Sequence, residues 1–343
     1  MIPDGAPPRV GTGLVLGKFL PPHRGHRLLV DFARASVTDV TVLVCSLARE
    51  EIPGALRHAW MAEEFPSCRV VHVTDENPQE PHEHPRFWEI WRETVRRHLP
   101  TGPDVVFTSE AYGDPLAQAL GAEHVAVDPD RVLVPTSGTA VRADPMARFD
   151  DLLPAARPWF VRRVCVAGPE STGKTTLARA LADRYRTAWV PEYGRAFLDR
   201  KGAPCAREDI PHIARGQVAS EDAAARAANR VLVCDTDLLA TVFWSETFFG
   251  DCPAWIRAEA DRRRYDLTIL TDIDVPFEAD WQRHLPHARE AFLARCEGDL
   301  VARGRAYVKV SGPHERRLSQ ACAAIDGLLR RGPATPGARS GTA

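Results

Sequence analysis

The chain has 343 residues, of which 44% are apolar and 26% are charged, and its formal net charge is −2. These are globular values, so wholesale disorder is excluded, and the length favours two domains. No block of like charge indicates a nucleic-acid arm or a membrane-surface patch. No apolar run approaches the roughly 20 residues that a membrane span needs. The first residues lack the layout of a signal peptide, so we expect a cytoplasmic protein.

In the first half of the chain, short apolar runs alternate with helical patterns, which is typical of a parallel sheet with helices on its faces. Strands are expected over residues 13–17, 40–46, 69–73, 104–108 and 124–127. Helices are expected over residues 24–35, 55–65, 86–98 and 115–120, a closing helix over 142–153 and a linker over 154–158.

The same alternation restarts in the second half. Strands are expected over residues 161–167, 187–190, 230–234, 266–271 and 306–310, and helices over 175–186, 207–229 and 315–329. From Gly332 onward small and polar residues dominate without periodicity, which predicts disorder. The sequence therefore predicts an α/β protein with two doubly wound parallel-sheet domains over 12–153 and 160–330, and a disordered tail over 331–343.

The eight cysteines are scattered and form no C-x-x-C pair. Cys45, Cys165 and Cys234 lie inside apolar runs, where a thiol acts as a small apolar group. We expect buried or inert thiols rather than zinc ligands or disulfides.

The first motif with chemical content is His23-Arg24-Gly25-His26, which follows the strand ending at Gly17 and begins a helix. A helix N-terminus favours an anion, and imidazole N–H groups can stabilise charge that develops on phosphate oxygens. We therefore expect His23 and His26 to be catalytic. A pair of surface histidines beside a turn is the alternative.

A second motif, Ser137-Gly138-Thr139-Ala140-Val141-Arg142, precedes another predicted helix. Its hydroxyls can cap the helix or bind a triphosphate, and the Arg142 side chain is a planar fork that suits phosphate. Alone, it is an ordinary helix cap. Together with His23 and His26 it resembles the S-x-T-x-x-R element of the H-x-G-H nucleotidyltransferase superfamily, which transfers the AMP moiety of ATP and releases pyrophosphate. The resemblance implies an ATP site made of Gly17, Lys18, Phe19, His23, His26, Ser137, Thr139 and Arg142.

Trp88 and Trp91 share one face of a predicted helix. They either pack in the core or stack on a pyridinium ring, since a flat cation is attracted to an aromatic face. With residues 52–60 and 107–113 they resemble the nicotinamide-nucleotide adenylyltransferase domains of the bifunctional NadR type. The resemblance implies substrate contacts by Arg57, Trp88 and Trp91.

In mid-chain, Gly168-x-x-x-x-Gly173-Lys174-Thr175 lies between a predicted strand and a predicted helix, as a Walker A loop requires. Its N–H groups cradle phosphates, Lys174 bridges the β- and γ-phosphates, and the Thr175 hydroxyl ligates Mg²⁺. We expect ATP contacts here from Gly168, Ser171, Thr172, Gly173, Lys174, Thr175 and Thr176. No N-K-x-D run is present, which disfavours a GTPase.

Three acids follow the strands of this half. Asp235 and Asp237 close one strand, where a carboxylate can hold Mg²⁺ or orient a hydroxyl, although both can also cap a helix. Glu192 follows another strand, where many nucleoside kinases carry an acidic base for the sugar hydroxyl, although a solvated loop acid is an equal alternative. Which acid is the base stays open. The expected roles are metal binding by Thr175 and Asp235, catalysis by Lys174, Glu192 and Asp235, and substrate binding by Glu192, Tyr193 and Asp237.

Residues 271–283 resemble the D-V-P-W-x-x-D-G-x-R stretch of ribosylnicotinamide kinases, with Phe277 in place of Trp and Trp281 in place of Gly. P-loop kinases place a phosphate-covering lid after the fourth strand. Arg283 is the expected ATP contact there and Arg289 a second candidate, although either is equally consistent with a surface arginine.

Residues 13–330 together resemble the bifunctional NadR family. The resemblance implies a ribosylnicotinamide kinase joined to a nicotinamide-nucleotide adenylyltransferase, with Mg²⁺ as cofactor and ATP as co-substrate. The implied partners are ribosylnicotinamide, nicotinamide mononucleotide and NAD, with no nucleic acid and no membrane. Some members carry an N-terminal helix-turn-helix, but few residues precede the first strand here, so no DNA-binding role is expected.

Two other functions stay open at this point. One is a nucleotide sensor of low turnover, and the other is a kinase fused to a nucleotidyltransferase for another phosphate ester. A homo-oligomer is also left open.

Overall fold

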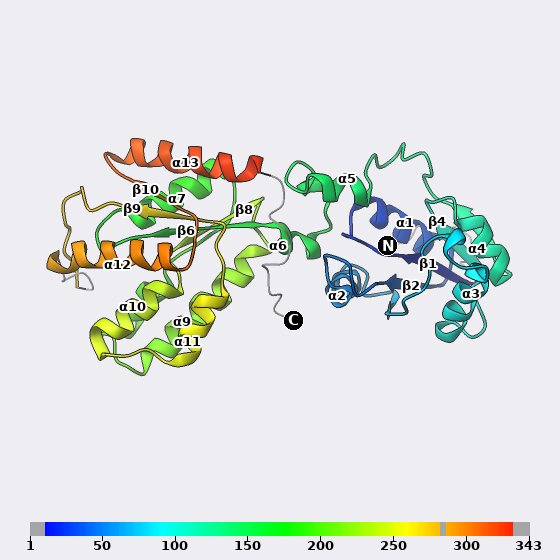
Figure 1. The fold of residues 1–343 in the computed structure, drawn as a ribbon, viewed down its shortest axis with the longest axis horizontal. Coiled ribbons are helices and arrows are strands. Elements are labelled where there is room, and N and C mark those ends of the chain that lie inside the picture. The colour runs from blue at the N-terminus through cyan, green and yellow to red at the C-terminus, as the bar shows by residue number, and fades with distance from the viewer. Residues whose placement is uncertain (1–10, 282–285, 332–343) are drawn as a thin grey trace, which may run out of the picture. The chain divides into compact units, whose positions relative to one another are not determined.

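The computed structural model describes residues 11–281 and 286–331 (Figure 1). They form two compact units, one up to Arg157 and one from Pro158. Each unit contains one five-stranded sheet in which the paired strands are parallel. The predicted α/β fold with two parallel-sheet domains is confirmed. Within the described ranges, no helix is long and apolar enough to cross a membrane.

The sheet of the first unit has the strand order β3-β2-β1-β4-β5. Its strands are β1 (Thr12–Gly17), β2 (Asp39–Cys45), β3 (Arg69–Val73), β4 (Val105–Thr108) and β5 (Glu123–Ala126). From the central strand β1, strands β2 and β3 are added toward one edge of the sheet, and β4 and β5 are then added toward the other. Ligands of such sheets bind outside the carboxyl ends of the strands at this switch point. Gly17, the last residue of β1, lies there.

Helices cover both faces of this sheet: α1 (Arg24–Ser36), α2 (Gly54–Glu64), α3 (Phe87–His98) and α4 (Gly113–Leu120). Successive residues of a strand face opposite sides, so neighbouring β1 residues belong to different cores. Val15 packs with Val30 of α1 and Met61 of α2. Leu14 packs with Val95 of α3 and Leu116 of α4.

The predicted closing helix over residues 142–153 is wrong. The helix in this region, α5 (Gly138–Ala143), ends where Asp144 leaves the helical backbone region (φ −148°, ψ 82°). Pro145 follows, and a proline ring disfavours helical backbone at the residue before it. The chain continues as separate 3₁₀ turns, of which η2 spans Phe149–Asp151.

The segment predicted as a linker is packed against the first unit. It contains a 3₁₀ turn, η3 (Pro154–Ala156), followed by the short helix α6 (Arg157–Phe160). Ala155 is buried, and its N–H donates to Oε1 of Glu64 at 2.7 Å. The boundary between the units therefore falls inside α6.

The sheet of the second unit has the strand order β10-β9-β6-β8-β7. Its strands are β6 (Arg162–Ala167), β7 (Trp189–Val190), β8 (Val231–Asp235), β9 (Leu267–Thr271) and β10 (Tyr307–Val310). Strand β6 is central and ends immediately before the Gly168 loop. The loop therefore lies at the carboxyl edge of the sheet.

Helices of the second unit lie on both faces of its sheet. In Figure 1, α7 (Lys174–Tyr185) and α13 (His314–Arg330) cover one face, and α12 (Arg289–Ala302) covers the other. The remaining helices are α8 (Tyr193–Lys201), α9 (Asp209–Ala225), α10 (Leu238–Phe249) and α11 (Ala254–Arg262). The sequence patterns predicted α7, α9 and α13 but not α8, α10, α11 or α12. The predicted disordered tail lies, from residue 332 on, outside the described residues.

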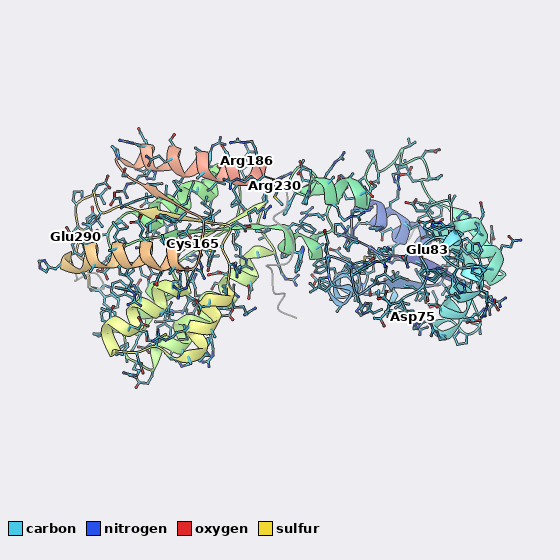
Figure 2. The ribbon with its side chains drawn as sticks, viewed as in Figure 1. Asp75, Glu83, Cys165, Arg186, Arg230 and Glu290 are labelled. Atoms are coloured by element: carbon cyan, nitrogen blue, oxygen red, sulfur yellow. The ribbon has the colours of Figure 1, made fainter. Side chains whose placement is uncertain are left out.

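The cysteines are all free thiols. Cys165 and Cys234 lie opposite each other on β6 and β8 and have no exposed surface. Figure 2 shows Cys165 in the interior of its unit. Cys45 is also buried, so the expectation for the three thiols in apolar runs is confirmed.

Candidate functional site

The histidine motif occupies the turn between β1 and α1. His23 is the N-cap of α1, and its Nδ1 accepts a hydrogen bond from the Gly25 N–H at 3.1 Å. Nδ1 of His26 accepts a hydrogen bond from the His23 N–H at 3.2 Å. Both Nδ1 atoms are acceptors, so in each neutral ring the proton lies on Nε2. Each imidazole therefore presents one Nε2–H donor.

The two imidazoles are held neutral. Their rings stack with centroids 3.7 Å apart, and the edge of Phe19 covers His26. Burial lowers the pKa of His23 from 6.5 to about 4, and Asp151 only partly offsets this. Burial and the neighbouring His23 hold the pKa of His26 well below its usual range. At neutral pH the pair can donate to a phosphate without carrying charge.

The Ser137–Arg142 motif lies beside these histidines. Ser137 caps α5 by accepting the Ala140 N–H at 3.2 Å. Arg142 donates to Oγ1 of Thr139 at 3.2 Å and to the Leu20 carbonyl in the β1–α1 turn.

Gly138 shows how close the two motifs approach. A Cβ added to it would lie 3.9 Å from Nε2 of His23 and 3.1 Å from the Leu20 carbonyl. The structure therefore brings the two predicted motifs together at the carboxyl end of β1.

Two other predicted contacts of the first unit differ in exposure. Lys18 is exposed, and its Nζ lies 3.2 Å from Oε1 of Glu50. Arg57 has no exposed surface, and its guanidinium donates to the carbonyls of Ile52 (3.1 Å), Cys45 (3.3 Å) and Lys18, and to Glu50. This geometry does not support the predicted substrate contact, because Arg57 holds the surrounding loops from within the protein.

The two tryptophans of α3 also differ. Trp91 is 8% exposed, packs with Val95 and Leu99, and donates its Nε1–H to the Pro78 carbonyl at 3.0 Å. Trp88 is partly buried and lies edge-to-face with Phe87 at 4.8 Å. Trp91 is therefore a core residue, and Trp88 is the member of the pair that keeps accessible indole surface.

The Walker A loop of the second unit is built from residues that tolerate its geometry. Gly168 has φ +144°, and an added Cβ would lie 2.9 Å from the backbone carbonyl of Thr271, so only glycine fits. Thr172 Oγ1 lies 2.7 Å from Oγ1 of the same Thr271. Gly173, with φ +78°, begins α7 without a side-chain cap. The first amides of α7 therefore face the loop, where anions are favoured.

Two residues of this region form a pair suited to Mg²⁺. The Thr175 hydroxyl donates to Oδ2 of Asp235 at 2.5 Å, and Asp235 is 1% exposed. Mg²⁺ prefers oxygen ligands and usually takes one or two from the protein, with phosphates and waters completing its shell. The described residues contain no cluster of three or more His, Cys, Asp or Glu side chains that could enclose a metal. Thr175 and Asp235 fit an ion that is completed by nucleotide phosphates.

Asp237 has a different environment from Asp235. It caps α10 by accepting the Ala240 N–H at 3.2 Å, and it pairs with Nη1 of Arg305 at 3.4 Å. Burial raises its pKa although Arg305 opposes this. This geometry favours the alternative role of a helix cap over the predicted substrate contact.

A cavity of about 660 Å³ opens in front of the loop. All of the predicted Walker A contacts line it: Gly168, Ser171, Thr172, Gly173, Lys174, Thr175 and Thr176. Lys174 donates to the Pro169 carbonyl at 2.7 Å, so its ammonium lies against the loop. Glu192, the N-cap residue of α8, lies on the cavity wall.

An aromatic wall at this cavity was missed from the sequence. Trp244 and Phe248 of α10 stack with centroids 5.3 Å apart, and Phe292 of α12 lies 5.1 Å from Trp244. All three line the cavity. The apolar sequence of α10 resembles a buried core helix, which hides this role. The sequence did show that this helix directly follows the strand ending at Asp235, and this position could have indicated that its side chains reach the cavity.

The segment after β9 lies over the same loop. The Glu278 N–H donates to Oγ of Ser171 at 2.7 Å, and Asp280 pairs with Arg195 of α8 at 2.5 Å. Arg289 donates to the carbonyls of Val275 (3.1 Å) and Ser171 (3.4 Å). Arg283 lies outside the described residues.

A second arginine at the loop, Arg317, was not predicted. It is 4% exposed, lines the cavity, and donates to the carbonyls of Thr172 (2.8 Å) and Asp272 (3.1 Å). It comes from α13, far from any recognisable motif. Only the fold places it at the phosphate loop.

Similar proteins share both units. A family described as AAA domain matches residues 163–317. Two crystal structures share the fold at a TM-score of 0.76. One is of NadR protein in complex with NR (20% identity, 93% of this chain and 96% of that chain), and the other of NadR protein in complex with NAD and AMP-PNP (19%, 95% and 98%).

Curated relatives cover most of the chain. It is 30% identical over 297 residues to the trifunctional NAD biosynthesis/regulator protein NadR of Escherichia coli, covering 80% of this chain and 72% of the relative. The protein of the same name from Salmonella typhimurium is 30% identical over 304 residues, covering 82% and 74%. The chain therefore belongs to the NadR family.

Proposed function

We propose that the protein carries out two ATP-dependent steps of NAD synthesis. The unit spanning residues 160–330 phosphorylates ribosylnicotinamide to nicotinamide mononucleotide, and the unit spanning 12–153 adenylylates that mononucleotide to NAD⁺. The observation that carries this proposal is that each unit has a phosphate-binding arrangement of different chemistry at the carboxyl edge of its own sheet. Family membership supports it.

In the adenylylation step, an oxygen of the mononucleotide phosphate attacks the α-phosphorus of ATP, and pyrophosphate leaves. The nucleophile is already an anion near neutral pH, so the step needs positioning and charge stabilisation rather than a strong base. The Nε2–H donors of His23 and His26 serve the phosphate oxygens, and Arg142 and Lys18 add positive charge. Trp88 is the aromatic surface offered to the nicotinamide ring.

In the kinase step, the 5′-hydroxyl of ribosylnicotinamide attacks the γ-phosphorus of ATP, and ADP leaves. Lys174 and the amides that begin α7 bind the phosphates. Mg²⁺, held by Thr175 and Asp235, would neutralise phosphate charge. Glu192, which lines the cavity, orients the hydroxyl and accepts its proton, whereas Asp235 is placed to hold Mg²⁺ with Thr175 and Asp237 caps α10.

The aromatic wall of the kinase cavity supports a flat, positively charged substrate. A pyridinium ring is attracted to the faces of Trp244, Phe248 and Phe292, because an aromatic face carries negative charge density. A substrate with a neutral base gains less from this wall. The wall therefore favours ribosylnicotinamide over an uncharged nucleoside.

The test is incubation of the purified protein with ribosylnicotinamide, ATP and Mg²⁺, with products followed by mass. We expect nicotinamide mononucleotide and ADP first, and then NAD⁺ and pyrophosphate, over many turnovers. Binding without repeated turnover would instead indicate a nucleotide sensor. Pyrophosphate release with another phosphate ester, but not with nicotinamide mononucleotide, would overturn the adenylylation step.

A further inference from the structure

The backbone that follows Glu192 is held by a hydrogen bond of the next residue. The Tyr193 N–H donates to Oε1 of Gln217, on α9, at 3.1 Å. That N–H belongs to the peptide that joins Glu192 to Tyr193, so the bond fixes the rotation that follows the Glu192 Cα (φ −59°, ψ 107°). Gln217 is 2% exposed and lines the same cavity as Glu192.

Gln217 is itself held in one orientation. Its Nε2 donates to Oε1 of Glu221, one turn further along α9, at 3.2 Å. Glu221 has no exposed surface, accepts from the Tyr265 hydroxyl at 2.8 Å, and pairs with Arg263 at 3.2 Å and Arg163 at 3.4 Å. A carboxylate paired with guanidinium groups only accepts hydrogen bonds, so the amide nitrogen faces Glu221. The amide oxygen is thereby directed at Tyr193.

Gly216, next to Gln217, makes a second contact with the same residue. A Cβ added to Gly216 would lie 2.1 Å from Cε1 of Tyr193, so the tyrosine ring lies directly against the backbone of α9. No side chain fits between them. Tyr193 is thus fixed twice, through its amide by Gln217 and through its ring by Gly216.

We propose that Gln217 and Gly216 are positioning residues of the kinase site, which act through Tyr193 to set where the Glu192 carboxylate lies in the cavity. This inference rests on the proposed kinase function, in which Glu192 serves the 5′-hydroxyl. In this role both residues act through Tyr193 rather than on the reacting atoms. A displacement of about 1 Å at a reacting group costs roughly 100-fold in rate, so a fixed backbone here has catalytic consequences.

The test is a double-mutant cycle in the full chain with Gln217→Leu and Glu192→Gln. Q217L removes the acceptor of the Tyr193 N–H, while Glu221 keeps its Tyr265 partner. We expect Q217L to lower kcat/KM for ribosylnicotinamide by about 10- to 100-fold and to leave the KM for ATP unchanged. In the E192Q background the same change is expected to cost less than about twofold, because residues that act as one unit are not additive.

Gly216→Ala tests the second contact independently of the amide. Its matched control is Gly298→Ala on α12, where an added Cβ meets open space. We expect G216A to reproduce the loss seen in Q217L, including its suppression by E192Q, and G298A to leave both activities at the parental level. An unchanged KM for ATP shows in each variant that the phosphate loop is folded.

The outcomes separate this inference from the function on which it rests. A parent protein that does not phosphorylate ribosylnicotinamide refutes the proposed kinase function. If the parent is active, two results would overturn the positioning role while the kinase function stands. One is that the effects of Q217L and E192Q on kcat/KM multiply. The other is that Q217L and G216A leave kcat/KM unchanged.

Discussion

The guanidinium of Arg142 donates a hydrogen bond to the Leu20 carbonyl, 122 residues earlier in the chain. The same side chain donates to Thr139. One residue thus joins α5 to the β1–α1 turn and places a permanent positive charge beside His23. Arg142 therefore contributes both to the structure and to the charge of this site.

Arg142→Lys separates these two contributions. Lysine keeps the charge but cannot serve Thr139 and Leu20 through one planar fork. We expect adenylyltransferase kcat/KM to fall by about 10- to 100-fold, as for loss of a fixed donor to developing charge. Kinase turnover should not change. The control is Arg148→Lys, whose side chain pairs with Asp151 at 3.4 Å, and full adenylyltransferase activity in R142K would contradict the role.

The two activities are expected to be separable. His26→Ala removes an Nε2–H donor from the first unit and should abolish NAD⁺ formation while mononucleotide accumulates. Lys174→Ala removes the ammonium that we propose binds phosphate in the second unit, and it should do the reverse when nicotinamide mononucleotide is supplied. Product analysis by mass distinguishes the two variants. Equal loss of both activities in either folded variant would argue against independent sites.

The stability of the first unit should depend on pH through His23. Its pKa is about 4 in the folded protein and 6.5 in the unfolded chain. Between these values the unfolded chain binds more protons, so the free energy of unfolding should fall as pH decreases from 6.5 to 4. The size of the loss is on the order of 3 kcal/mol.

Urea unfolding of the protein across this pH range measures the effect. His23→Asn is the matched variant, because asparagine can still cap α1 but does not titrate. The free energy of unfolding of H23N is expected to depend less on pH than that of the parent protein, because the contribution of His23 is removed. An identical slope in both proteins would exclude His23 as a source of the dependence.

Asp235 and Asp237 are expected to respond differently to the same change. Asp235→Asn weakens the oxygen pair with Thr175, so the Mg²⁺ concentration for half-maximal kinase activity should rise by about tenfold or more. Asp237→Asn weakens the pairing with Arg305 and should lower stability instead, with little change in the Mg²⁺ requirement. Mg²⁺ titrations and thermal unfolding distinguish the two. A shared Mg²⁺ phenotype would contradict the assignment.

The two tryptophans of α3 are expected to respond differently to replacement by alanine. Trp91→Ala empties a core position and should cost about 3–5 kcal/mol of stability. Trp88→Ala should cost less and should raise the KM for nicotinamide mononucleotide, because it removes the accessible ring. Chemical unfolding and adenylyltransferase kinetics provide the two measurements. A normal KM in W88A would exclude stacking on this indole.

Local chemistry explains what could be predicted from the sequence. The Walker A loop needs glycine where it passes close to another strand, as Gly168 does at the backbone of Thr271. Such a requirement can be recognised from the amino-acid sequence. The strands of both sheets could be predicted from apolar runs, since buried parallel strands are continuous stretches of apolar residues. The break at Pro145 could also have been predicted, because proline restricts the residue before it, although the predicted helix over residues 142–153 ran through it.

What could not be predicted depends on how distant segments meet. Asp235 and Asp237 differ because Thr236 adopts a left-handed backbone (φ 74°), which turns the chain between them. The burial of Arg57 depends on the carbonyls of Cys45 and Ile52, at the two ends of the β2–α2 loop, and on that of Lys18 in the β1–α1 turn, and nothing in its neighbours indicates this. Gln217 resembles any helical glutamine until α8 is placed against α9.

The bare amides that begin α7 have a thermodynamic consequence. A helix start that relies on phosphate oxygens as its cap ties the melting of the second unit to the nucleotide pool, since a bound ligand adds RT ln(1 + [L]/Kd) to stability. The free energy of unfolding of the second unit would then rise and fall with the nucleotide concentration, and the unit would unfold more readily where ATP is scarce.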